Sequence, residues 1–171
     1  MADFKLAWAL TLVHEGGFTD NENDNGNWTG GKKGVGELKG TKYGISAHSF
    51  PDLDIKNLTP EDAGKIYLEK YWNTLYNQIE EQVIANKIFD MSVLFGVQTA
   101  VRLLQEVLQT GFQIQADGGF GPITLSAINK SDVVSLLKSY KTHLVSHILA
   151  IAAANPNDRQ FVSGWLKRIN S

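Results

Sequence analysis

The sequence of 171 residues has no cysteine, no long apolar run and no excess of charge of either sign. Without cysteine the chain can form neither disulfides nor thiolate metal sites, so side-chain packing must stabilise it. No stretch approaches the ~20 apolar residues that span a bilayer, which predicts no stable membrane insertion. The opening segment MADFKLAWALTLV is interrupted by Asp3, and no small-residue cleavage site follows it, so we expect no signal peptide.

The balance of charge excludes one class of partner. The chain has sixteen basic and eighteen acidic residues, which gives a net charge of −2, and the basic residues form no stripe that could neutralise phosphates. We therefore expect no nucleic-acid binding. With 43% apolar residues and neither an internal repeat nor a linker, we expect one monomeric domain over residues 1–171.

Apolar periodicity predicts a mainly α fold with a Gly/Asn-rich loop or small β-hairpin after the first helix. We expect the first helix over residues 3–15, apolar nearly all round and hence buried, and closed by Gly16 and Gly17. The other expected helices run from Pro60 behind a Thr59 cap to 72, from about 78 to 96, from 97 to before 111, from Pro122, from a Ser131 cap to Asn155, and through Phe161, Trp165 and Ile169.

Glu15 lies where the first helix is expected to end, beside a loop rich in Gly, Asn and Asp. The unpaired carbonyls of a helix C-terminus disfavour an ionised carboxylate by about 0.3–1 kcal/mol. This effect alone is too small to keep a glutamate protonated at neutral pH, so apolar neighbours would have to add to it. A protonated glutamate beside a polar cleft can act as the general acid that cleaves a glycosidic bond.

Glycoside cleavage also needs a second group, and three loop carboxylates are candidates. Asp20, Glu22 and Asp24 all follow Glu15 in the polar loop, where solvent would keep them ionised. The alternative for each is an ordinary turn residue, because Asp and Asn bond to their own backbone in loops.

Several motifs resemble those of glycoside hydrolase family 108, the N-acetylmuramidases of bacteria and phages with a lysozyme-like fold. They are HEGGF at 14–18, TKYGIS at 41–46, YLEKYW at 67–72, FDMSVLFG at 89–96, DGGFGPITLSAI at 117–128 and GWLKRI at 164–169. The resemblance covers nearly the whole chain. It implies that Glu15 is the catalytic acid, because the glutamate of the family's EGG motif falls on it.

The resemblance also implies the partner of Glu15. Phage lysozymes show a glutamate, an aspartate after eight intervening residues and then a threonine, and Glu15 and Asp24 have that gap. Thr29 lies one residue before the position at which that pattern has its threonine, whereas Thr41 lies in the family's TxxGI motif. Asp24 or a threonine hydroxyl would orient water on the face opposite Glu15 and give inversion, whereas carboxyl groups only about 5–5.5 Å apart would favour retention.

The chain departs from the family pattern in two places. Residues 25–40 are longer than the expected turn and would form a flap or a β-hairpin, in which Trp28 either stacks on a sugar or pins the loop. Leu94 stands where the family usually has an asparagine, so we expect Asn73 or Gln98 to supply the missing polar contact. Tyr43 of the TxxGI motif is a further expected substrate contact.

The resemblance thus predicts a muramidase that cleaves the β-1,4 bond between N-acetylmuramic acid and N-acetylglucosamine in peptidoglycan, without cofactor or metal. Residues 1–95 would carry the catalytic motifs, and residues 96–171, the family's peptidoglycan-binding region, would pack with them as one unit. We expect a phage or prophage endolysin that stays cytoplasmic until a holin-type pore releases it to the cell wall or periplasm. The alternative is a non-catalytic wall-binding or secretion-accessory protein.

Overall fold

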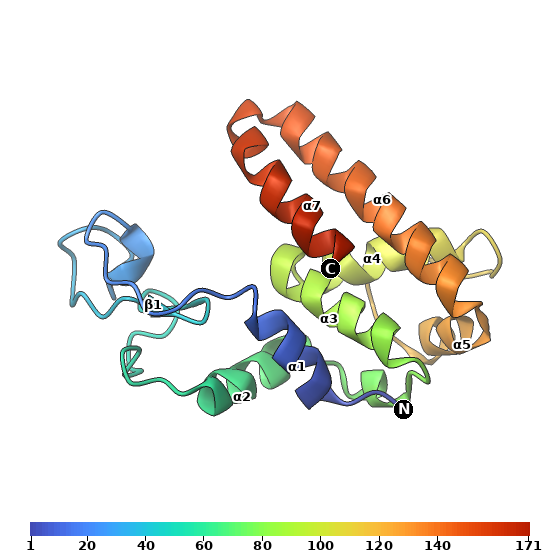
Figure 1. Ribbon diagram of the computed structural model, residues 1–171, viewed down its shortest axis with the longest axis horizontal. Helices are drawn as coiled ribbons and strands as arrows, with labels where there is room; N and C mark the ends of the chain where they lie inside the picture. The colour runs from blue at the N-terminus through green and yellow to red at the C-terminus, as the bar shows by residue number, and fades with distance from the viewer. The chain divides into compact units, whose positions relative to one another are not determined.

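The computed structural model describes residues 1–171, and the chain forms two compact units. Unit 1 contains Met1–Ala7 and Tyr71–Ser171, and unit 2 contains Trp8–Lys70. Seven α-helices and a single two-stranded antiparallel sheet confirm the predicted mainly α, lysozyme-like class (Figure 1). No helix combines the length and the apolar content that crossing a membrane requires.

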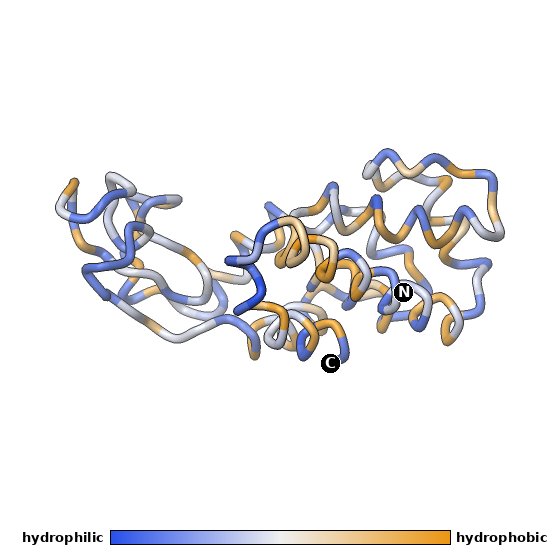
Figure 2. The backbone as a smooth tube through the Cα atoms, turned by 90° about the horizontal axis from the view of Figure 1, so that it is seen from above, coloured by the Kyte–Doolittle hydropathy of each residue, from blue (hydrophilic) through white to orange (hydrophobic).

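Unit 1 is a helical bundle. Its elements are η2 (Thr74–Gln78), α3 (Gln82–Phe95), α4 (Val97–Leu108), α5 (Pro122–Lys130), α6 (Val133–Ala154), η3 (Pro156–Phe161) and α7 (Val162–Asn170). Helix α7 runs back along α6 (Figure 1). Apolar residues recur along these helices (Figure 2), and those that face inward, among them Ile88, Leu104, Leu144 and Ile148, are fully buried.

An aromatic cluster and an ion pair hold the N- and C-terminal segments of unit 1 against its centre. The Phe4 ring meets the rings of Trp72 and Phe89 edge-on, at 5.5 and 5.4 Å between centroids. At the other end, Arg168 forms a 2.9 Å ion pair with the buried Asp90. Asp90 therefore has a salt-bridging role.

Lys87 ties the last turn of α7 to α3. Its ammonium donates hydrogen bonds to the carbonyl oxygens of Arg168 and Ile169, at 3.1 and 3.0 Å. These carbonyls belong to a helix C-terminus, where they lack partners within the helix. Burial lowers the pKa of Lys87 to about 8, although the neighbouring Asp90 acts in the opposite direction.

Unit 2 is built around Trp8. It contains the second part of α1 (Phe4–Leu12), η1 (Asn25–Asn27), β1 (Thr41–Lys42), β2 (Ile45–Ser46) and α2 (Pro60–Tyr71), except for the last residue of α2. The indole of Trp8 lies 4.6 Å from the ring of Tyr67 and donates to the carbonyl of Pro60 at 3.2 Å. A Cβ on Gly64 would lie 2.9 Å from the Trp8 Nε1, so only glycine lets α2 approach this closely.

The end of the first helix differs from the prediction. Helix α1 ends at Leu12 instead of residue 15, because the amides of His14 and Glu15 donate to Thr11 and Leu12 in tighter three-residue turns. Gly16 and Gly17 do not adopt positive φ, so they do not form the left-handed cap.

The predicted burial of the first helix is also wrong on one face. Ala7, Trp8 and Thr11 are buried, but Leu6 and Leu10 are more than half exposed and Val13, just beyond the helix, is 80% exposed. An apolar pattern all round a helix shows that every face could be buried, and packing partners decide which face is.

Two helix starts were misplaced, and the remaining helix limits agree closely with the prediction. Helix α3 begins at Gln82, since Asn73 caps a separate 3₁₀ turn before it. Asp132, and not Ser131, caps α6 through a bond from the Ser135 amide, whereas the Ser131 hydroxyl bonds back to α5. The predicted Thr59 cap of α2 is confirmed by a 3.1 Å bond from the Asp62 amide.

The single domain over residues 1–171 stays a prediction.

Candidate active site

A tight hairpin forms the centre of the candidate site in unit 2. Strands β1 and β2 pair Thr41 with Ser46 and Lys42 with Ile45, which leaves Tyr43 and Gly44 as the two turn residues. Both have positive φ, at 51° and 72°, as a type I′ turn requires. Tyr43 is the one non-glycine residue of the chain in this region, which is uncommon for a bulky side chain.

Two hydrogen bonds hold Tyr43 in this conformation. Its amide donates to the carbonyl of Gly16 at 3.0 Å, and its carbonyl accepts from the Tyr67 hydroxyl at 2.9 Å. The turn is thereby fixed to the segment after α1 and to α2. Unfavourable backbone conformations of this kind persist only where the surroundings enforce them, and they concentrate at functional sites.

Glu15 lies against the same turn. A Cβ built on Gly44 would come within 2.5 Å of Glu15 Oε2 and within 2.5 Å of the Tyr67 hydroxyl. The carboxyl group and the hydroxyl therefore pack over one face of Gly44, and any larger residue would displace them. Glu15 is half-buried and Tyr67 is buried.

Asp24 and Thr41 are joined through Asn27, whose side chain is 0% exposed. Asp24 caps η1 by accepting from the Gly26 amide at 2.9 Å, and its carbonyl accepts from the Asn27 amide. The Thr41 hydroxyl donates to Asn27 Oδ1 at 2.6 Å, and Asn27 Nδ2 donates to the carbonyl of Asn21 at 3.0 Å. One buried amide thus fixes both ends of the polar loop.

Residues 25–40 form an irregular hairpin, one of the two predicted forms. Trp28 bridges Leu38, and the Thr29 amide donates to Glu37 at 2.9 Å. The indole N–H of Trp28 donates to the carbonyl of Glu22 at 2.9 Å, so Trp28 does pin the loop. Its ring remains partly exposed.

Asn73 and Gln98 belong to unit 1, where both lie against the segment that precedes α5. Asn73 caps η2 through Oδ1 and donates to the carbonyl of Phe120 at 3.3 Å. The Gln98 side chain packs on Gly118, where a Cβ would lie 2.5 Å from it. The structure thus gives both residues a local role, and their predicted contact with substrate stays a prediction.

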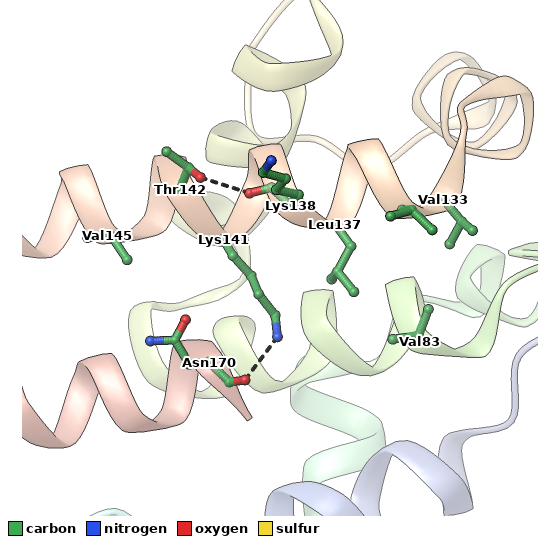
Figure 3. Close-up of a pocket in the computed structure, with 9 residues that line it drawn as sticks. Val83, Val133, Leu137, Lys138, Lys141, Thr142, Val145 and Asn170 are labelled. Atoms are coloured by element: carbon green, nitrogen blue, oxygen red, sulfur yellow. Dashed lines mark hydrogen bonds between the residues drawn. The ribbon is translucent and has the colours of Figure 1, made fainter.

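Two hollows of the surface are lined by residues other than the predicted catalytic ones. One of about 420 Å³ in unit 2 is lined by Phe18, Asp20, Leu38, Asp52 and Asp54, among others, but by none of Glu15, Asp24 and Thr41. A hollow of about 500 Å³ in unit 1 has valine walls around Leu137 and Lys141 (Figure 3). The ammonium of Lys141 donates to the carbonyl of Asn170 (Figure 3), so it is already engaged.

Sequence reasoning missed three residues of this site, namely Asn27, Gly44 and Tyr67. Gly44 and Tyr67 lie inside the motifs TKYGIS and YLEKYW. The motifs marked both residues as part of the family pattern but did not indicate what either residue does. Asn27 sits among many loop asparagines, and nothing in its sequence context distinguishes the buried one.

Comparison with known proteins identifies the family of the chain. The family model Glycosyl hydrolase 108 matches residues 8–96, and the model Predicted Peptidoglycan domain matches residues 99–170. No protein with a curated description matches the chain.

A solved structure titled "Structure of Brucella abortus SagA" shares the fold. It is 23% identical, with a TM-score of 0.70 over 98% of this chain and 89% of the other. At this identity the likeness concerns the fold alone. The first family model, however, spans more than half of the chain and contains Glu15, Asp24, Thr41, Gly44 and Tyr67. The chain therefore belongs to glycosyl hydrolase family 108 and is a glycoside hydrolase whose substrate is peptidoglycan.

Proposed function

We propose that the protein is a muramidase that cleaves the β-1,4 bond between N-acetylmuramic acid and N-acetylglucosamine, with Glu15 as general acid. The observation that carries this proposal is the packing of the Glu15 carboxyl group over Gly44, beside the Tyr67 hydroxyl. The segment after α1, the β1–β2 turn and α2 meet at this carboxyl group. Proton transfer to a glycosidic oxygen requires an acid that its surroundings hold in position.

Glu15 gives its proton to the bridging oxygen as the bond from that oxygen to the anomeric carbon breaks. The N-acetylglucosamine alcohol leaves, and positive charge develops on the muramic acid ring. Tyr67 acts as a positioning residue, because its hydroxyl donates to Tyr43 and so holds α2 against the turn beside Glu15.

In the same displacement, water attacks the anomeric carbon from the opposite face and loses a proton to Asp24. One oxygen of Asp24 accepts from the Gly26 amide, and a carboxylate has acceptor capacity beyond that bond. Thr41 already donates its hydroxyl hydrogen to Asn27, so toward a water it serves as acceptor only. We therefore assign Asp24 as the base, Thr41 as the residue that orients the water, and inversion as the outcome.

Trp28 and Tyr43 would contact the glycan beside these groups. Both rings are partly exposed, and Lys42 lies over the ring of Tyr43 at 5.3 Å. Action as a monomeric phage or prophage endolysin, released to the wall through a holin-type pore, belongs to the same proposal and is supported only by the motif resemblance.

Product analysis tests the proposal. Purified sacculi are digested with the protein, the products are reduced with borohydride and their masses are measured. Reduced muramic acid ends are expected, whereas reduced glucosamine ends or free stem peptides would overturn the assigned bond. Proton NMR early in the digestion should show the α anomer, as inversion requires.

A further inference from the structure

A polar hollow of about 410 Å³ lies beside the segment that connects α4 to α5. Its lining includes the side chains of Gln113, Ile114, Gln115, Asp117, Pro122 and Ile123. None of these residues takes part in the proposed reaction. The hollow lies within residues 99–170, which match the peptidoglycan domain model.

Buried hydrogen bonds hold the wall of this hollow. Gln105 is only 2% exposed, and its Nε2 donates to Asp117, Gly119 and Thr124 at 2.8 to 3.1 Å. Its Oε1 accepts from the Gly118 amide at 2.8 Å. The part of the wall from Asp117 to Thr124 therefore needs little ordering when a ligand binds, which favours affinity.

The hollow presents polar groups that the chain itself does not use. The side-chain amides of Gln113 and Gln115 make no hydrogen bond within the protein, and Asp117 accepts only through Oδ1. Each glutamine amide offers two donor hydrogens and one acceptor oxygen. Together these groups match a ligand with several hydroxyl and amide groups.

The charge of the hollow disfavours an anionic ligand. Hydrogen bonds from the Gly119 amide and from Gln105 lower the pKa of Asp117, which therefore stays ionised. No lysine or arginine lines the hollow to offset that charge. Peptidoglycan stem peptides carry free carboxylates, so the neutral sugar units fit better.

Apolar side chains complete the match. Ile123 is 70% exposed, and it lines the hollow together with Pro122 and the half-buried Ile114. Such a surface can cover an acetyl methyl group and the C–H face of a sugar ring. Ligand sites commonly combine apolar walls with a few orienting polar groups.

We propose that this hollow binds a neutral N-acetylglucosamine unit of the glycan strand, through Gln113, Gln115 and Asp117 against the surface of Ile123. The choice of ligand rests on the proposed function. The larger hollow of Figure 3 offers no comparable set, because its walls are mainly apolar and Lys141 is engaged with Asn170 and Ser171.

The test uses the full chain with Glu15→Gln to prevent turnover, and a tetramer of N-acetylglucosamine as the probe. Amide NMR signals of residues 113–123 should shift saturably as the probe is added. Gln113→Ala combined with Gln115→Ala should weaken this response at least about fivefold, because the ligand loses a hydrogen bond to each of the two amides. Ile123→Ser should weaken it as well.

The matched control is Gln78→Ala combined with Gln160→Ala, which removes two exposed glutamines outside the hollow and should leave the response unchanged. Signals that do not shift, or a double variant that binds like its parent, would overturn the site. Digestion of sacculi by the protein that retains Glu15, without the Glu15→Gln change, is measured in a separate assay. Hydrolysis without the shifts refutes only this site, and shifts without hydrolysis refute only the proposed reaction.

Discussion

Gly44 links the backbone of the hairpin to the position of the Glu15 carboxyl group. We predict that Gly44→Ala lowers the rate of peptidoglycan hydrolysis about a hundredfold, because the added methyl would displace Glu15 and Tyr67. Its positive φ adds a cost of about 1–2 kcal/mol to folding. Initial clearing rates of sacculi and the free energy of unfolding in urea measure the two effects.

The control for this variant is Gly34→Ala. Gly34 has φ 78°, close to the 72° of Gly44, but a Cβ there would meet nothing within 4 Å. It should lose similar stability and keep its activity. If Gly44→Ala and Gly34→Ala were equally active, displacement of Glu15 by the added methyl would be refuted.

Lys87 predicts a pH dependence of stability. Its pKa falls from 10.5 to about 8 on folding, so between these values the unfolded chain binds more protons than the folded one. The free energy of unfolding should therefore rise with pH in this window, by at most about 1.4 kcal/mol per pH unit. Urea unfolding at pH 8 and pH 9.5 should show this gain in the wild type but not in Lys87→Met. If the free energies of unfolding of the two proteins differed by the same amount at both pH values, the prediction would be contradicted.

At the level of single residues, the sequence indicated the charged groups of the candidate site but not the residues that position them. Glu15 stood out because it is a carboxylate beside two glycines. Tyr67 did not, because its spacing in α2 is equally typical of a core residue, and its hydroxyl meets the turn only in the folded chain. Contacts between residues far apart in sequence leave no local signal.

Among the elements, helix starts marked by a proline were predicted most accurately. Pro60 and Pro122 begin α2 and α5 as expected. The end of α1 at Leu12 was missed, because tighter turns end it before its two glycines. The exposed side of α1 was missed for another reason, since a uniformly apolar helix does not indicate which face finds a partner.

The polar loop of unit 2 depends on one buried side chain. We predict that Asn27→Ala destabilises the protein by roughly 1–3 kcal/mol, because the Thr41 hydroxyl and the Asn21 carbonyl lose a buried partner. Activity should fall further than stability explains, since Asp24 and Thr41 lose their common anchor. Urea unfolding and clearing assays measure both.

Asn157→Ala is the comparison for Asn27, because Asn157 is exposed and its side chain makes no hydrogen bond within the chain. It should change stability by less than about 0.5 kcal/mol. A similar small change for Asn27→Ala would show that the loop does not depend on the buried amide.

For the whole molecule, we predict one cooperative unfolding transition. Unit 1 is made of two chain segments, Met1–Ala7 and Tyr71–Ser171, and unit 2 is the stretch between them, so the order of either restricts the other. Leu144→Ala in unit 1 should cost about 2–5 kcal/mol, because Leu144 is fully buried. Hydrogen exchange should then show an equal loss of protection in α2 of unit 2.

Leu149→Ala provides the control on the same helix, since Leu149 is 52% exposed and should change little. Unchanged protection of α2 in Leu144→Ala would mean that the units unfold separately, against the predicted single domain.

The central claim is that Glu15 donates the proton that cleaves the glycan. The most direct measurement compares clearing of sacculi suspensions by the wild type, by Glu15→Gln and by Glu69→Gln, which makes the same change at an exposed position on α2. With unfolding free energies matched, Glu15→Gln should lose at least about a hundredfold in rate, and Glu69→Gln should clear like the wild type. Clearing by Glu15→Gln at the wild-type rate would contradict the account.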